Sequence, residues 1–314
     1  MIMRMPMKTF MKMSMRVARY APLLLSLCVG QALADTPINL SHDATANVHV
    51  TVSNVKGTVT VTAWDRNQVQ VSGQLGDGAK PMAITGSNDA LVVKVEPQGG
   101  SSMFNWHGDN AMSSSSLELH VPKGASLDIN VISAPLVIDG IDGGNIVVST
   151  VSGKSRINAR TPSLKVESVS GGIELAGHTE QADLQTVSGD ILAPTLGSAV
   201  KLQTISGHIQ ADGGPWQKLT LSTVSGDVQL TGKLAANGNL SIDSLSGNVQ
   251  LQLPTNTSGA LHASSFSGDL RSDFGTPQKP EHGPGSTLDT HLGSGGGTIN
   301  VETFSGDLRI RKQD

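Results

Sequence analysis

Residues that could perform chemistry recur directly after a repeated Ser-Gly pair. This column consists of Lys154, Gly172, Asp190, His208, Asp227, Asn248, Asp269 and Asp307. If the repeats stack, Asp190, His208 and Asp227 lie on adjacent levels, where they could hold a metal ion or form an acid-base pair. Asp, Asn, Gly and His are also ordinary turn residues. We favour the turn interpretation, because the GGxGxD-type nonapeptide of calcium-binding β-rolls is absent, and we predict no metal site and no cofactor.

The serine of each Ser-Gly pair forms a second column, and His208 lies beside it. A Ser-His-Asp triad needs one serine that is oriented by one base, which is in turn held by an acid. A serine in every repeat is better explained as a hydroxyl that satisfies backbone groups at a recurring corner. We therefore predict no catalytic residue.

Both columns belong to an internal repeat with the pattern Thr/Ser, apolar residue, Ser, Gly. Copies begin every 18 to 21 residues, with one longer gap before the last copy. A period of this length indicates stacked units that are too small to bury an apolar face alone. The residues predicted to form the repeated structural corners are Thr150, Ser152, Gly153, Ser170, Gly171, Thr186, Ser188, Gly189, Thr204, Ser206, Gly207, Thr223, Ser225, Gly226, Ser246, Gly247, Ser267, Gly268, Ser305 and Gly306.

Apolar residues alternate with polar ones on both sides of each corner, which predicts strands. The two alternations are out of step, so the inward parity must change at the corner. We expect the change directly after the Thr/Ser, with Thr186 and Val187 both pointing inward and Asp190 facing solvent. The glycine fits a bend where a side chain would be crowded.

These patterns predict an all-β protein, a single-stranded parallel β-solenoid, β-helix-like, of about nine to ten short coils. Weaker copies of the repeat place its beginning near residue 46, and the strands that follow suit an antiparallel N-terminal cap region. We expect one solenoid domain at 35–314. Its parts are a cap-like insertion at about 62–126, regular coils at about 127–271, a loop insertion at 273–297 and a terminal coil at 298–312.

Residues 1–34 have the pattern of a signal peptide. Five basic residues and no acidic ones precede the apolar run "APLLLSLCVG", and Ala32 and Ala34 suit cleavage before Asp35. The run is too short for a permanent membrane span, and Leu27 before Cys28 does not fit a lipoprotein signal. We expect an exported protein without a stable membrane span after cleavage. The periplasm is its first expected location, with the cell surface or secretion as alternatives.

Net charge argues against some partners. Removal of the five basic leader residues lowers the formal charge from -4 to -9. Nucleic acid and anionic lipid both require clustered Lys and Arg, so neither is expected as the main partner.

Two segments rich in Gly, Ser and Pro interrupt the repeat, at 96–116 and 273–297, and we expect both to be exposed loops. In the first, Phe104, Trp106 and His107 could contact a sugar or a protein. The alternative is that Trp106 covers an open end of the solenoid. In the second, His282 and His291 are too loosely spaced to predict a metal site.

The repeated "TVSGD" motif and the ending "ETFSGDLRIRK", Glu302–Lys312, resemble the bacterial putative adhesin family. This is a domain of unknown function with repeated T-V-S-G-D motifs, and its members are β-helix-like envelope proteins. The likeness spans about residues 48–312. It implies an envelope protein, and the family has no agreed catalytic residues to carry over.

Our first functional hypothesis is therefore a non-enzymatic, adhesin-like envelope protein that binds an envelope protein or a surface polysaccharide through its face and loops. A second hypothesis is a hydrolase or lyase that acts on polysaccharide, which predicts a groove lined by converging acids. A third is a structural or assembly protein whose copies stack end to end.

Overall fold

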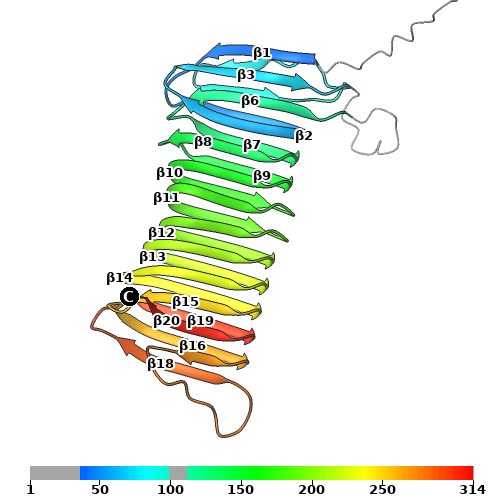
Figure 1. The fold of residues 1–314 in the computed structure, drawn as a ribbon. Coiled ribbons are helices and arrows are strands. Elements are labelled where there is room, and N and C mark those ends of the chain that lie inside the picture. Colours follow the sequence, from blue (N-terminus) through cyan, green and yellow to red (C-terminus); the bar gives the residue numbers. More distant parts are fainter. Residues whose placement is uncertain (1–35, 99–111, 314) are drawn as a thin grey trace, which may run out of the picture. The chain divides into compact units, whose positions relative to one another are not determined.

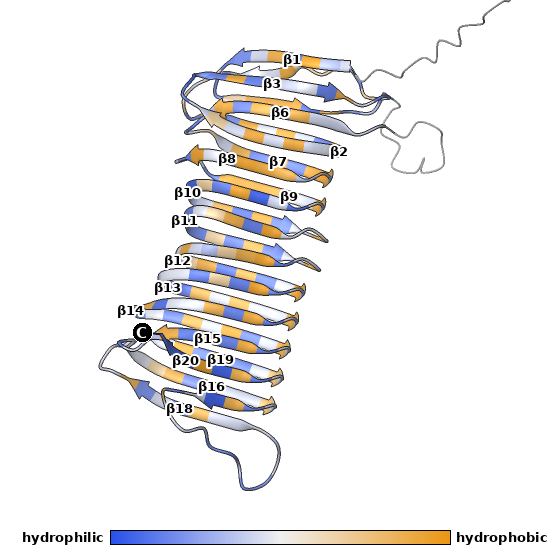
Figure 2. Cartoon of the chain, viewed as in Figure 1, coloured by the Kyte–Doolittle hydropathy of each residue, from blue (hydrophilic) through white to orange (hydrophobic). Residues whose placement is uncertain are grey.

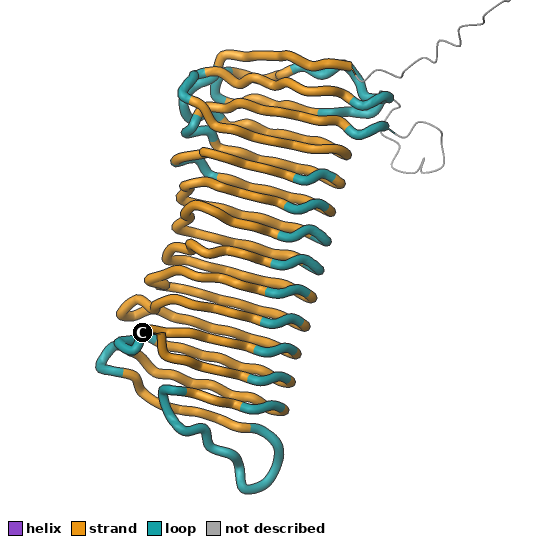
Figure 3. The backbone as a smooth tube through the Cα atoms, viewed as in Figure 1, coloured by secondary structure: helices purple, strands orange, loops and turns teal. Residues whose placement is uncertain are grey.

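The computed structural model describes residues 36–98 and 112–313, and every regular element within them is a strand (Figure 3). The strands join one sheet, which is mostly parallel and begins antiparallel. The predicted all-β, mainly parallel architecture with an antiparallel start is confirmed. A membrane-spanning helix is not found in the described part of the chain.

Long strands that pair with their neighbours in the repeat dominate the middle of the described unit. The strands are β1 (Thr36–Asp43), β2 (His49–Trp64), β3 (Gln68–Leu75), β4 (Ile84–Ser87), β5 (Ala90–Lys94), β6 (Ser115–Pro122), β7 (Ser126–Ser133), β8 (Leu136–Asp142), β9 (Ile146–Ser152), β10 (Ser155–Ser168), β11 (Ile173–Thr186), β12 (Ile191–Ser206), β13 (Ile209–Ser225), β14 (Val228–Ser246), β15 (Val249–Pro254), β16 (Gly259–Ser267), β17 (Leu270–Ser272), β18 (Ser286–Leu292), β19 (Thr298–Ser305) and β20 (Leu308–Gln313).

Equivalent residues of successive repeats stack in register. Leu184 of β11 is paired with Leu202 of β12, and Ile173 is paired with Ile191. All four side chains are at most 1% exposed. Because strand residues alternate between two faces, each repeat delivers its Leu, Ile and Val side chains to one continuous core and its polar residues to solvent. The same alternation is visible along the strands in Figure 2.

The corner of each repeat differs from our expectation. Thr186 is 5% exposed, but Val187 is 42% exposed, so the prediction that Val187 points inward is wrong. Val187 and Ser188 both face solvent, and Gly189 is the next buried residue. The change of inward parity therefore takes two residues instead of one. As the chain bends around the core here, both of these residues lie on the outside of the bend.

Glycine at the corner allows neighbouring coils to come close together. A Cβ placed on Gly189 would lie 2.2 Å from the carbonyl oxygen of Gly171, and one on Gly226 would lie 2.0 Å from that of Gly207. A side chain in this column would force the coils apart.

At both ends of the stack, the order in space differs from the order in sequence (Figure 1). Strand β2 lies between the coil of β5 and β6 and the coil of β7 and β8. The C-terminal pair β19 and β20 lies between β14/β15 and β16/β17. Antiparallel strands close the ends, with β1 and β3 near the N-terminus and β18 on β16. Strand β18 thus lies inside the segment that we expected to be a loop.

Candidate binding groove

The apolar residue of the corner motif forms an exposed column along the stack. The exposed fractions of its members lie between 39% at Val55 and 54% at Phe304. The flanking residues are paired from coil to coil, as Thr223 is with Ser244, so neighbours in the column lie about 4.8 Å apart. In spatial order, the apolar column is Val55, Ile132, Val151, Val169, Val187, Ile205, Val224, Leu245, Phe304 and Phe266.

The last two members of this column are aromatic. The rings of Phe304 and Phe266 stack with centroids 4.8 Å apart and an interplanar angle of 11°. They are neighbours because β19 is inserted next to β16, although Phe266 precedes Phe304 by a long stretch of chain. The inserted strand thus completes the aromatic end of the column.

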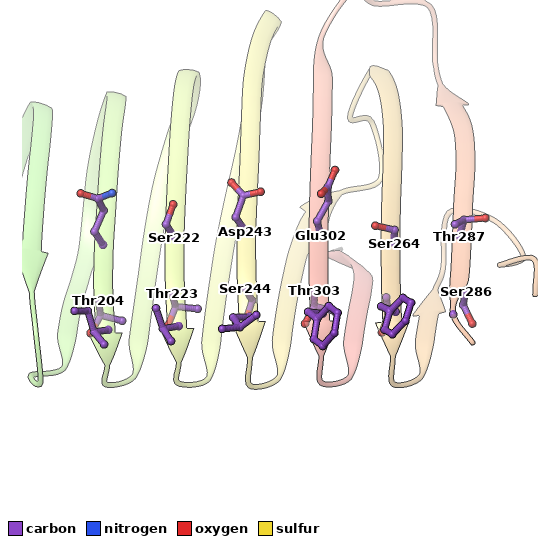
Figure 4. Close-up of a pocket in the computed structure, with 18 of the residues that line it drawn as sticks. Thr204, Ser222, Thr223, Asp243, Ser244, Ser264, Ser286, Thr287, Glu302 and Thr303 are labelled. Atoms are coloured by element: carbon purple, nitrogen blue, oxygen red, sulfur yellow. The ribbon is translucent and has the colours of Figure 1, made fainter. Parts of the chain in front are cut away.

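A polar column runs parallel to the apolar one, formed by the residue before each Thr/Ser. Figure 4 shows its members Ser222, Asp243, Glu302 and Ser264 side by side on neighbouring strands. Asp243 is paired in register with both Ser222 and Glu302. The members of the polar column that line the first groove are Glu167, Gln185, Gln203, Ser222, Asp243, Glu302 and Ser264.

The two columns are the walls of a groove of about 1080 Å³, and the Thr/Ser residues between them are its floor. The loop between β17 and β18 closes one end, where Lys279, Pro280 and Pro284 line the space. A second groove of about 660 Å³ continues along the same columns and shares Glu167 and Ser168 with the first.

Charged groups are distributed unequally between the two grooves. In the second groove, the Glu96 carboxylate lies 2.8 Å from Lys94 Nζ and 3.0 Å from Lys80 Nζ. Hydrogen bonds from Lys94 and then Lys80 lower the pKa of Glu96 from 4.5 to about 2. In the first groove, Asp243 and Glu302 are adjacent, and neither forms an ion pair within the described residues.

In the column after each glycine, Asp side chains accept hydrogen bonds from the backbone of the next coil. Asp190 Oδ1 accepts a hydrogen bond of 2.9 Å from the His208 backbone N–H, and Asp227 Oδ1 accepts one of 2.9 Å from Asn248. His208 Nδ1 lies 4.0 Å from Asp227 Oδ2. No group of three or more possible metal ligands is found among the described residues. Four side chains of this column, those of Asp190, Asp227, Asn248 and Asp307, thus accept hydrogen bonds from the backbone of the neighbouring coil.

Some hydroxyl groups at the corner form hydrogen bonds and others do not. Ser170 Oγ donates to the Val151 carbonyl at 3.1 Å, as expected for a structural serine. On the inward side, Ser168 Oγ donates to the Gly171 carbonyl and accepts from the Gly171 N–H, both at 2.9 Å. Four other inward hydroxyls are buried without a hydrogen-bond partner in the structure, namely those of Thr204, Thr223, Ser244 and Thr303.

A family model described as Toastrack DUF4097 matches residues 47–311. The chain belongs to this family. The resemblance to a putative adhesin family of unknown function is thereby confirmed. None of the curated proteins matches the Toastrack chain.

Solved structures that resemble the Toastrack chain share little sequence with it. One is described as a putative lipid binding protein from Parabacteroides distasonis, with 12% identity, a TM-score of 0.50 and coverage of 88% of this chain and 96% of that one. A putative adhesin from Bacteroides fragilis has 11% identity, a TM-score of 0.40 and coverage of 88% and 98%. A putative cell adhesion protein from Clostridium sporogenes has 10% identity, a TM-score of 0.27 and coverage of 88% and 100%. At such identities, the first likeness shows the fold alone.

Of the residues singled out in the sequence, the corner residues Thr186, Thr204 and Thr223 line the groove, whereas Asp190, His208 and Asp227 do not. The candidate contact residues Phe104, Trp106 and His107 lie outside the described residues. His282 is exposed in the loop before β18, and His291 is exposed on β18 itself. The sequence did contain a signal for the apolar column, because Val, Ile, Leu or Phe follows the Thr/Ser in every copy of the Toastrack repeat. We misread that signal as core packing.

Proposed function

We propose that this Toastrack protein is a non-enzymatic, exported envelope protein that binds another envelope or surface component in the groove of its β-solenoid of about nine to ten coils. The observation that carries the proposal is the apolar column. Single exposed apolar residues are ordinary on protein surfaces, but a contiguous row of them marks an interaction site. The neighbour from Parabacteroides distasonis is described as a putative lipid binding protein, which is also a binding role.

A polysaccharide hydrolase or lyase receives less support. The groove does contain carboxylates, from Glu167, Asp243 and Glu302, but they lie in one column on the same wall. A typical glycosidase places two carboxyl groups on either side of the scissile bond. Here the facing wall is apolar, with Leu245 opposite Asp243 and Phe304 opposite Glu302.

End-to-end stacking also receives less support. The outermost strands of the described unit include β1 and β18, which are antiparallel to their neighbours, and β17, which has three residues. Very short edge strands blunt a sheet against further pairing, and antiparallel end strands do not continue the parallel stacking of the coils.

The test of the proposed function is capture from envelope extract with immobilised protein that begins at Asp35. The groove variant is Ile205→Ser/Val224→Ser/Leu245→Ser, and we expect it to lose the bound material. A matched control is Val137→Ser/Val147→Ser/Leu192→Ser, because these side chains are 36%, 39% and 38% exposed but lie outside both grooves. Equal recovery on both variants and the wild type would refute binding in the groove.

Two further measurements cover the rest of the proposal. N-terminal sequencing of the protein from a periplasmic fraction should begin at Asp35, and recovery of the uncleaved chain from the cytoplasm would contradict export. Deletion of residues 100–114 tests Phe104, Trp106 and His107. Unchanged recovery of the bound material from that variant would remove these three residues from consideration.

A further inference from the structure

The two walls of the first groove require an amphipathic ligand. Each coil contributes one apolar and one polar side chain, as Ile205 and Gln203 do for one coil and Leu245 and Asp243 for another. A hydrocarbon chain would remove water from the polar wall without replacing its hydrogen bonds, which is costly. A pyranose ring has C–H groups on its faces and hydroxyls at its edge, so it matches both walls at once.

The spacing of the groove also fits a polymer. Neighbouring coils are about 4.8 Å apart. A 1,4-linked pyranose unit has five bonds of ~1.5 Å between its linking oxygens, and because the ring bends this path, each unit advances the glycan by roughly 5 Å. A strand that runs along the stack would thus place about one sugar unit on each coil. The groove wall from Val187 to Phe266 would accept about six units.

Charge narrows the class of glycan. Asp243 and Glu302 are adjacent across the β14–β19 pairing and form no ion pair within the described residues. The third carboxylate, that of Glu167, lies 2.8 Å from Lys165 Nζ. Among the described residues that line this groove, one is basic, namely Lys279. An ammonium group on the ligand would supply the missing counter-charge at Asp243 and Glu302, whereas a uronic acid polymer would be repelled.

We propose that the occupant of the groove is an extended polysaccharide strand with free amino groups, lying along the stack with its ring faces on the apolar column and its ammonium groups at Asp243 and Glu302. This inference rests on the proposed function, because it names the ligand class for the same groove. A single strand also suits a groove that is bordered at one end by the loop of Pro280 and Pro284.

The test is titration calorimetry with glucosamine hexamer, cellohexaose and galacturonate hexamer at about pH 5.5, above the usual carboxyl pKa. We expect the glucosamine hexamer to bind most tightly and the galacturonate hexamer not to bind. Asp243→Asn/Glu302→Gln should weaken the glucosamine hexamer about tenfold or more and leave cellohexaose unchanged, because only the charged contacts are lost. Ile205→Ser/Val224→Ser/Leu245→Ser should weaken both, while Val137→Ser/Val147→Ser/Leu192→Ser should weaken neither. Thermal melting of each variant checks that it is folded.

The outcomes separate the two proposals. Tighter binding of the galacturonate hexamer, or no binding of any glycan, overturns the inference. If capture from envelope extract still depends on the groove in that case, the proposed function stands. Binding to phosphatidylethanolamine vesicles would then identify a lipid, and groove-dependent self-association in sedimentation would identify a second copy. If capture does not depend on the groove, the proposed function fails as well.

Discussion

At the corner of the Toastrack repeat, the inward half is a hydroxyl residue and the outward half is an apolar residue, which is the reverse of the usual arrangement. Thr186 is 5% exposed, and the next residue, Val187, is 42% exposed. Protein interiors normally take the apolar residue and leave the hydroxyl to solvent. The difference teaches that the apolar column is not part of the core, so its residue type needs a reason outside folding. Substitutions in the inward half, by contrast, should change only the stability of the fold.

The largest effect should come from the inward glycine. A Cβ on Gly226 would lie 2.0 Å from the Gly207 carbonyl oxygen, so Gly226→Ala should lower the free energy of unfolding by about 3 kcal/mol or more. The matched control is Gly172→Ala, because the nearest atom to that Cβ is the Asp190 carbonyl oxygen at 3.6 Å. Urea unfolding measures both. Equal stability of the two variants would contradict the close approach of the coils.

The inward hydroxyls should divide into two classes. Ser168 Oγ makes two hydrogen bonds with Gly171, so Ser168→Ala should cost about 1–2 kcal/mol of stability. Thr223 Oγ1 is buried without a partner in the structure, so the isosteric Thr223→Val should stabilise the protein by about 1 kcal/mol. Melting temperatures of the two variants measure the difference. Destabilisation by both would mean that the Thr223 hydroxyl has a role that the geometry does not reveal.

The all-β, mainly parallel architecture could be predicted from the sequence, because the repeat period and the alternation of apolar and polar residues determine it. It could not give the order of the coils, because the copies are equivalent. Thr303 pairs in the same register with Ser244 on one side and with Ser265 on the other, so nothing local marks β19 as an inserted strand. Strand β18 was missed because Gly and Pro surround it.

The groove was missed for a different reason. The alternation before the corner and the alternation after it leave Val187 and Ser188 unassigned. The first alternation, continued, turns Val187 outward, whereas the second, continued backwards, turns it inward. We assigned it to the core because it is apolar. Only the bend itself, which turns Val187 and Ser188 outward together, decides the question.

The outward half should be nearly neutral for stability but decisive for binding. Val224→Ser and Leu245→Ser remove side chains that are 44% and 53% exposed, so each should change the free energy of unfolding by no more than about 0.5 kcal/mol. The two together should weaken capture from envelope extract. Stability is read from urea unfolding of the same samples. A large loss of stability would show that the column packs as core after all.

The smallest effect concerns the ion pairs of Glu96 in the second groove. Lys94 and Lys80 lower the pKa of Glu96 from 4.5 to about 2, so the folded state binds the proton less tightly than the unfolded state does. The stabilisation is therefore complete above about pH 4.5 and is lost as the pH falls toward 2. Because the three groups are exposed, water and salt screen this contribution, and it should fade as ionic strength rises. The measurement is the melting temperature of wild type and Glu96→Gln between these two pH values at low salt. The two curves should converge at the acid end, and a constant offset across the whole range would show that Glu96 acts through packing instead of charge.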